Sequence, residues 1–204
     1  MTANAPKLIL ASASPRRREL LSNMGVEFDV HAANIDESRT EDEVPEDFVI
    51  RLAREKAKQT SLDLQDQELG SKFGSKTAPI LAADTIVVQG DRVFGKPRDI
   101  EHAQKIWQAL SANRHQVLTA VCLLCEGRNQ IKLSITDVEF GRITEDQMLR
   151  YWETNEPQDK AGAYAIQGFA SAWVKQISGS YSNVVGLPLR EVNQLLAELN
   201  LNWL

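Results

Sequence analysis

Residues 80–88, Ile-Leu-Ala-Ala-Asp-Thr-Ile-Val-Val, contain the strongest strand signal in this sequence. Apolar residues, several of them β-branched, stand on both sides of one acidic residue, Asp84. A buried carboxylate costs free energy unless it is paired, hydrogen-bonded or bound to metal. The stretch therefore predicts an apolar strand in which Asp84 is either a metal ligand or general base, or a carboxylate bonded to a neighbouring backbone turn.

Asp84 and Thr85 are neighbours in the predicted strand, and both are polar. Successive side chains of a regular strand point to opposite faces of the sheet. The two residues can therefore serve one site only if the strand bulges or ends between them.

Both helices and further strands are predicted around this strand. Helical periodicity and capping residues predict helices over Pro15–Met24 and Pro45–Lys58, from about Asp99, after Thr144, and over Pro188–Leu199. Further strands are predicted over Lys7–Ala11, Glu27–Ala32, Gln116–Glu126, Gln130–Phe140, Ala163–Gln167 and Ala172–Ile177, with a hairpin turn at residues 89–92 and another at 127–129. Residues 60–79 are polar and predict a flexible surface loop. Strands mixed with helices and hairpins indicate a mixed α/β sheet.

The composition is that of a globular protein. The chain has 204 residues, of which 43% are hydrophobic and 25% charged, which excludes disorder as the main state. No apolar run approaches the roughly 20 residues that span a bilayer. With two Cys, no signal-peptide pattern and a net charge of −5, we expect a cytoplasmic protein with reduced thiols that binds nucleic acid poorly. Residues 1–6 predict a flexible N-terminus, and residues 7–204 a single domain.

An anion site is predicted at residues 11–18, Ala-Ser-Ala-Ser-Pro-Arg-Arg-Arg. Ser14 and Pro15 suit the start of a helix, but three arginines in its first turn oppose the helix dipole by roughly 0.3–1 kcal/mol each. A bound phosphate would make the electrostatic contribution of these arginines favourable. The alternative is that the arginines point to solvent. Because helix neighbours face different directions, not all three can reach one ligand.

Two further segments suit a nucleotide. Gly95-Lys96-Pro97-Arg98 is a rigid turn that presents Lys96, a point charge for phosphate or an ordinary surface lysine. Residues 159–168 are rich in small residues and contain Gln167, whose amide can read a nucleobase edge or serve structurally at a strand end. Cys122 and Cys125 have metal-ligand spacing but no second pair, which favours a place in the core.

Seven stretches taken together resemble the Maf family of nucleoside triphosphate pyrophosphatases. They are Leu-Ala-Ser-Ala-Ser-Pro-Arg-Arg (10–17), Ile-Asp-Glu (35–37), Leu-Ala-Arg-Glu-Lys-Ala (52–57), Ala-Ala-Asp-Thr (82–85), Gly-Lys-Pro (95–97), Asp-Lys-Ala-Gly-Ala-Tyr-Ala-Ile-Gln-Gly (159–168) and Gly-Ser-Tyr-Ser-Asn-Val-Val-Gly-Leu-Pro (179–188). The resemblance runs from Leu8 to about Leu196. Ala-Ile-Gln-Gly is similar to the branch that hydrolyses dTTP and UTP.

The resemblance implies an α/β fold with a mixed twisted sheet, flanking helices and two lobes around a deep cleft. It implies hydrolysis of the α–β phosphate link, giving the nucleoside monophosphate and pyrophosphate, with Mg²⁺ or Mn²⁺ as cofactor, and a homodimer. Site roles follow by position: Asp84 as proton acceptor; Arg16, Thr85 and Gln167 as substrate-selecting residues; Ser14, Arg17, Lys56, Lys96 and Lys160 as phosphate ligands; Glu37 and Asp84 as metal ligands. Whether Asp84 is base or metal ligand stays open.

Two other functions compete with this one. The first is a pyrophosphatase for modified purine nucleotides such as 7-methyl-GTP. The second is a nucleotide- or DNA-binding regulator of septum formation and cell division, the role after which the family is named. The presence of Asp84 together with Lys96 and Arg16 favours an active enzyme.

Overall fold

The computed structural model describes residues 7–66 and 78–198. The predicted flexible N-terminus, residues 1–6, and most of the predicted loop, residues 67–77, lie outside this part of the chain. The chain divides into two compact units. The first unit comprises residues 1–84, 120–133 and 186–204, and the second comprises residues 85–119 and 134–185.

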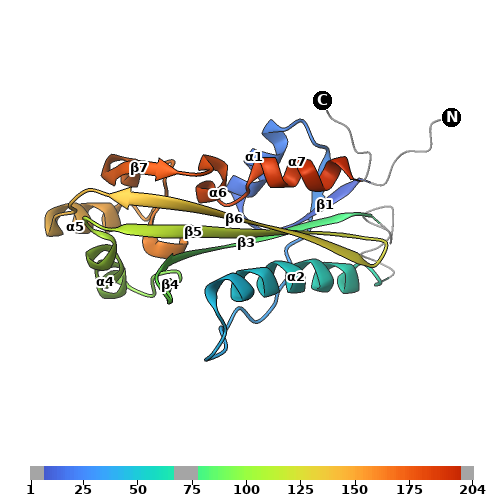
Figure 1. Cartoon of the computed structure of the whole chain (residues 1–204), viewed down its shortest axis with the longest axis horizontal. Helices are drawn as coiled ribbons and strands as arrows, with labels where there is room; N and C mark the ends of the chain where they lie inside the picture. The colour runs from blue at the N-terminus through green and yellow to red at the C-terminus, as the bar shows by residue number, and fades with distance from the viewer. Residues whose placement is uncertain (1–6, 67–77, 199–204) are drawn as a thin grey trace. The chain divides into compact units, whose positions relative to one another are not determined.

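A seven-stranded mixed sheet is the framework of the chain (Figure 1). Its strands are β1 (Leu8–Ala11), β2 (Phe28–Val30), β3 (Ile80–Gln89), β4 (Arg92–Phe94), β5 (Arg114–Cys125), β6 (Arg128–Phe140) and β7 (Val174–Ser178). The order is β2-β1-β3-β5-β6-β7, and β4 pairs with β3. Strand β1 is parallel to β2 and β3, whereas the β3–β4 and β6–β7 pairs are antiparallel. The predicted mixed α/β sheet is therefore confirmed.

Helices are found at all five predicted places, and the short helix α6 (Tyr181–Val185) was not predicted. They are α1 (Pro15–Asn23), α2 (Pro45–Asp63), α4 (Ile100–Leu110), α5 (Glu145–Glu153), α6 (Tyr181–Val185) and α7 (Leu189–Ala197), with 3-10 helices η1 (Ala161–Ala163) and η2 (Phe169–Trp173). The side chains of Ser14, Asp99 and Thr144 each accept a backbone N–H in the first turn of α1, α4 and α5. None of the helices that the structure describes has the length and apolar character that a membrane span needs.

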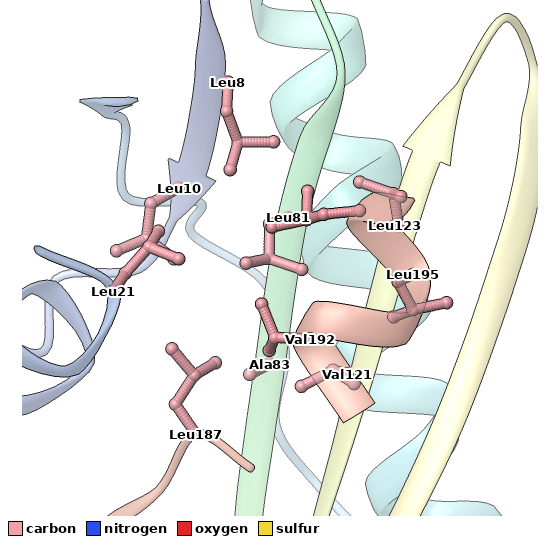
Figure 2. Close-up of a cluster of buried hydrophobic side chains, with 11 residues drawn as sticks. Leu8, Leu10, Leu21, Leu81, Ala83, Val121, Leu123, Leu187, Val192 and Leu195 are labelled. Atoms are coloured by element: carbon pink, nitrogen blue, oxygen red, sulfur yellow. The ribbon is translucent and has the colours of Figure 1, made fainter. Parts of the chain in front are cut away.

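The core of the first unit lies between its strands and helices α1 and α7 (Figure 2). Its members are the buried side chains of Leu8, Leu10, Leu21, Leu81, Ala83, Val121, Leu123, Leu187, Val192, Leu195 and Leu196. Leu81 and Ala83 of β3 both point into this core, two residues apart, as the strand period requires. Asp84 consequently points to the other face of β3, along which α2 lies (Figure 1).

An aromatic cluster forms the core of the second unit. It consists of Trp107, His115, Phe140, Tyr151, Tyr164 and Trp173, in tilted and edge-to-face contacts with ring centroids 4.8–6.1 Å apart. In such arrangements the edge of one ring contacts the face of the next. Each pair stabilises the fold by about 0.5–1.5 kcal/mol in addition to the effect of burying apolar surface. The cluster anchors residues 161–173, because these rings come from that segment and from the elements packed against it.

Four boundary predictions are wrong. The strand predicted over Ala163–Gln167 is η1 followed by turns, because Gly162 and Ala163 have φ values of 68° and 55°, which no strand residue adopts. A Cβ on Gly162 would stand 2.8 Å from Val87, so the close approach also requires glycine. The next strand begins at Val174 rather than Ala172, since Ala172 and Trp173 belong to η2.

The other two differences concern lengths. Helix α2 continues to Asp63, five residues beyond the predicted end at Lys58, and Thr60 is completely buried within it. The turn between β5 and β6 is Glu126-Gly127, with φ values of 50° and 76°, as two-residue hairpins require. Residues 128 and 129, predicted as turn, therefore begin β6.

Candidate active site

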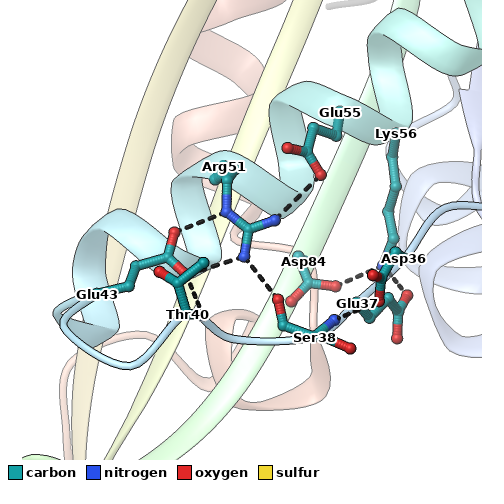
Figure 3. Close-up of polar contacts among 9 residues, drawn as sticks. All are labelled: Asp36, Glu37, Ser38, Thr40, Glu43, Arg51, Glu55, Lys56 and Asp84. Carbon is teal, nitrogen blue, oxygen red and sulfur yellow. Dashed lines mark hydrogen bonds and ion pairs between the residues drawn. The ribbon is translucent and has the colours of Figure 1, made fainter.

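The centre of the candidate site is an ion-pair cluster on the α2 face of β3 (Figure 3). Lys56 Nζ lies 2.5 Å from Asp84 Oδ1 and 2.6 Å from Glu37 Oε1. The side chains of Asp84 and Lys56 are only 10% and 11% exposed, whereas Glu37 is half exposed. The free-energy cost of burying Asp84 in an apolar strand is thus offset by a lysine from α2.

Glu37 is brought to this cluster by a loop that Arg51 holds against α2. Arg51 donates from Nε to Glu43 Oε1 at 2.7 Å and from Nη2 to Glu43 Oε2 at 2.8 Å, which is the bidentate geometry of strong Arg–carboxylate pairs. Its Nη2 also donates to the Ser38 carbonyl at 2.9 Å, one residue beyond Glu37. The hydrogen bonds between Arg51 and Glu43 raise the pKa of Arg51 and lower that of Glu43. The loop is therefore fixed at both sides of its acidic tip.

Arg17 ties helix α1 to the strand that carries Asp84. Its Nη1 donates to the carbonyl of Ala83 at 2.7 Å and to Ser12 Oγ at 3.4 Å, and its Nε donates to the carbonyl of Gly186 at 2.8 Å. Burial lowers the pKa of Arg17, while the charges of Asp84 and Glu37 act in the opposite direction. The predicted phosphate ligand therefore also holds the backbone next to Asp84.

The remaining predicted residues of the first unit are near α1. Ser14 is half-buried and is the N-cap whose Oγ accepts the N–H of Arg17 at 3.4 Å. Arg16 is half-buried, and its charge contributes to lowering the pKa of Arg17. The first unit thus brings together the predicted residues Ser14, Arg16, Arg17, Glu37, Lys56 and Asp84.

The other predicted residues belong to the second unit. Thr85 is half-buried, and its Oγ1 is 2.9 Å from that of Thr119 on β5. Lys96 and Gln167 are exposed, and Lys160 forms an ion pair with Asp159. A hydrogen bond from the N–H of Gly162 to the carbonyl of Gly95, 3.1 Å long, joins the Lys96 turn to the Lys160 segment.

Strand β3 continues through Asp84 and Thr85 without ending. The partners of the two side chains come from different elements, Lys56 of α2 and Thr119 of β5. The alternation expected of a regular strand is therefore confirmed for this pair.

The carboxylates of the cluster fit a divalent cation that shares its ligands with a substrate. No group of three or more His, Cys, Asp and Glu residues gathers within residues 7–66 and 78–198. Glu37 and Asp84, however, reach the same ammonium atom from two sides. Mg²⁺ commonly takes one or two carboxylates and completes its shell with water and substrate phosphates. These residues suit that kind of site and not a closed protein cage.

Comparison with known proteins decides the family. The model of the Maf-like protein family matches residues 7–199. The chain belongs to the Maf family. The resemblance found in the sequence is thereby confirmed.

Relatives of this Maf chain share almost its whole length. It is 47% identical over 197 residues to the dTTP/UTP pyrophosphatase of Pseudoalteromonas atlantica, covering 95% of this chain and 97% of the relative. It is 44% identical to that of Alkalilimnicola ehrlichii, covering 97% and 95%, and 43% identical to that of Vibrio cholerae, covering 93% and 96%. Insertions or missing segments are therefore small.

Sequence reasoning missed several residues that shape the Maf site. Arg51 could have been paired with Glu55 from their i,i+4 spacing, but its main partner, Glu43, lies outside the helix. Tyr151 and Glu156 have no local signal at all.

Proposed function

We propose that this Maf protein is a nucleoside triphosphate pyrophosphatase that hydrolyses dTTP and UTP to the nucleoside monophosphate and pyrophosphate. The observation that carries the proposal is the buried Asp84, paired with Lys56 on the face of β3 next to the half-exposed Glu37. The printed names of the relatives support the substrate class. Such an enzyme is a hydrolase acting on phosphorus-containing anhydrides.

In the proposed reaction Asp84 accepts a proton from water, and the water oxygen forms a bond to the α-phosphorus. The bond between the α-phosphorus and its bridging oxygen then breaks, and pyrophosphate leaves with the electron pair. Lys56 donates to Asp84 Oδ1 at 2.5 Å and so fixes the position of the accepting carboxylate. No residue of the cluster is required as a covalent nucleophile.

Basic side chains supply the positive charge that a triphosphate needs. We assign phosphate contacts to Ser14, Arg17, Lys56, Lys96 and Lys160, of which Arg17 and Lys56 already lie beside the Asp84 segment. Glu37 and Asp84 would hold the divalent cation, Mg²⁺ or Mn²⁺. When bound, this cation neutralises phosphate charge and makes water more acidic.

Base selection is assigned to Gln167, acting with Arg16. Thr85 is not used in this assignment, because it lies on the face of β3 opposite Asp84 and its hydroxyl contacts that of Thr119. Uracil and thymine present two carbonyl acceptors beside one N–H donor, which one amide can complement in part as donor and acceptor. Gln167 is exposed in a segment of small residues, where a flat base can approach. Cytosine replaces one acceptor by an amino donor and should be a poorer substrate.

The proposed place of action is the cytoplasm, as a homodimer that needs no membrane or nucleic acid. Both cysteines, Cys122 and Cys125, are free thiols, as in proteins of reducing compartments. A net charge of −5 disfavours nucleic-acid binding.

The test is incubation with UTP, dTTP, CTP, GTP and 7-methyl-GTP in the presence of Mg²⁺, with both products of each reaction identified. We expect dTTP and UTP to react fastest and to yield pyrophosphate. Orthophosphate and the nucleoside diphosphate as primary products would contradict the bond assignment. Fastest turnover of 7-methyl-GTP would favour the purine enzyme, and nucleotide binding without turnover the division regulator.

Asp84→Asn is the matched inactive variant. It keeps the shape of the side chain but cannot accept the proton, and loss of a general base costs about 10²–10⁴ in rate. Thermal unfolding of the variant should remain cooperative. A variant that retains more than about a tenth of wild-type turnover removes Asp84 from the mechanism.

A further inference from the structure

The segment that carries Gln167 is fixed to its surroundings at three backbone atoms. Trp107 Nε1 donates to the carbonyl of Ala163 at 2.7 Å. The N–H of Ala165 donates to Tyr151 Oη at 3.0 Å, and the N–H of Phe169 donates to Glu156 Oε2 at 3.4 Å. The last two bonds lie two residues before and two residues after Gln167.

The two side chains that bracket Gln167 are also bonded to each other. Tyr151 donates its phenolic hydrogen to Glu156 Oε1, with the oxygens 2.6 Å apart. Tyr151 is 3% exposed, and its ring packs against Trp107 and Trp173 at centroid distances of 5.5 and 4.8 Å. One buried phenol therefore connects the aromatic core to Glu156 and to the backbone before Gln167.

The Glu156 carboxylate lies very close to the backbone of Gly168. A Cβ atom built on Gly168 would lie 1.9 Å from Glu156 Oε2, far inside van der Waals contact. The φ of Gly168 is −113°, which is not in the left-handed region, so a side chain here would conflict with the Glu156 carboxylate in its present position and not with the value of φ. The carboxylate lies directly against the residue that follows Gln167.

Gln167 itself is exposed, and in the part of the chain that the structure describes its amide has no hydrogen-bond partner. Its position is therefore set by its backbone alone. An amide that reads a base edge must be held within about 0.5 Å of the productive geometry by the groups around it. In this segment those groups are Tyr151 and Glu156.

We propose that Tyr151 and Glu156 form a clasp that positions Gln167 and so sets the discrimination between pyrimidine bases. This inference rests on the proposed function, because it assigns the clasp to the base-reading amide of that reaction. The two residues are positioning residues. Neither touches the substrate, and their effect passes through the backbone of residues 165–169.

Three variants test the clasp. Tyr151→Phe removes one oxygen and keeps the ring between Trp107 and Trp173. Glu156→Ala removes both acceptor oxygens, and Glu156→Gln keeps one oxygen for the N–H of Phe169. The matched control is Arg150→Ala on the same helix, which breaks only the exposed pair with Asp146.

The main measurement is the ratio of kcat/KM for UTP to that for CTP. Tyr151→Phe and Glu156→Ala each remove one hydrogen bond to the backbone of the Gln167 segment. Each variant should therefore lower the ratio about three- to tenfold. The decrease should arise mainly from a higher KM for UTP. Glu156→Gln should recover most of the ratio, and Arg150→Ala should leave it unchanged. A general loss of folded protein would lower both rates together and leave the ratio as it was.

The dependence on Gln167 is tested in a double variant. In a Gln167→Ala background, Tyr151→Phe should not change the ratio further, because the positioned group is gone. A full additional effect would show that the clasp acts through another residue and would overturn the proposal.

Amide hydrogen exchange of residues 163–169 measures how firmly this segment is held and does not depend on catalytic turnover. Exchange should be faster in Tyr151→Phe than in the wild type or in Arg150→Ala. Unchanged exchange, or an unchanged UTP/CTP ratio in an active enzyme, overturns the clasp and leaves the proposed function intact. Absence of turnover in the wild type, with faster exchange in Tyr151→Phe, overturns the proposed function and retains the clasp as a device that holds this segment.

Discussion

His115 should make the stability of this protein fall steeply in mildly acidic solution. It is 2% exposed within the aromatic cluster, with edge-to-face contacts to Phe140 and Tyr164. Its Nε2 lies 2.9 Å from Tyr164 Oη, and its Nδ1 has no hydrogen-bond partner in the described residues. An imidazolium needs an acceptor at both nitrogens, so the ring is buried in its neutral form. Burial accordingly lowers the pKa of His115 to about 4.

The size of the effect follows from linkage. Because the folded pKa of His115 is below its unfolded value of about 6.5, the unfolded chain takes up the proton first as the pH falls. The stabilisation is therefore complete above pH 6.5 and is lost progressively down to pH 4. At about 1.4 kcal/mol per pH unit the full loss is about 3 kcal/mol, of which about 2 kcal/mol is lost by pH 5.

The assay is urea denaturation at pH 7, 6 and 5, followed by tryptophan fluorescence. His115→Gln stays neutral throughout and can still bond to the Tyr164 hydroxyl. The free energy of unfolding of the wild type should fall by about 2 kcal/mol more than that of this variant between pH 7 and pH 5. His102→Gln, a more accessible histidine, serves as the control and should follow the wild type. Parallel curves for wild type and His115→Gln would refute the reasoning.

Three further outcomes are expected. Arg51→Ala should free residues 36–43, giving faster proteolytic cleavage there and about tenfold lower turnover, since Glu37 loses its support; equal cleavage of variant and wild type would contradict this. Gln167→Glu should depress turnover of dTTP and UTP at least about tenfold while the urea midpoint stays unchanged, and equal kcat/KM for UTP, CTP and GTP in the wild type would show that base-edge reading is wrong. Thr144→Ala should lower the free energy of unfolding by about 1 kcal/mol in urea titrations, because it removes the capping box with Gln147, and no change would count against that cap.

Short-range signals in the sequence were sufficient for most elements. Ser14, Asp99 and Thr144 mark the starts of α1, α4 and α5, because a cap bonds only to backbone groups two or three residues away. The apolar run at 80–88 predicts β3 for a similar reason. The mixed sheet and the family also follow from the sequence.

Longer-range contacts decided the segments that were predicted wrongly. The strand expected at Ala163–Gln167 is instead a 3-10 helix and turns, held by the Trp107 side chain and by the close approach of Gly162 to Val87. Those partners are tens of residues away in the chain. Local propensity has no information about them.

The candidate site shows the same division. The sequence by itself determined that Asp84, a carboxylate in an apolar strand, must have a partner, because an unpaired buried charge is too costly. Only the tertiary structure decided that the partner is Lys56, that Arg51 holds the Glu37 loop beside it, and that Tyr151 and Glu156 bracket Gln167. The physical reason is that the cost of burial is a property of one residue. The compensating contacts depend on where the chain returns in space.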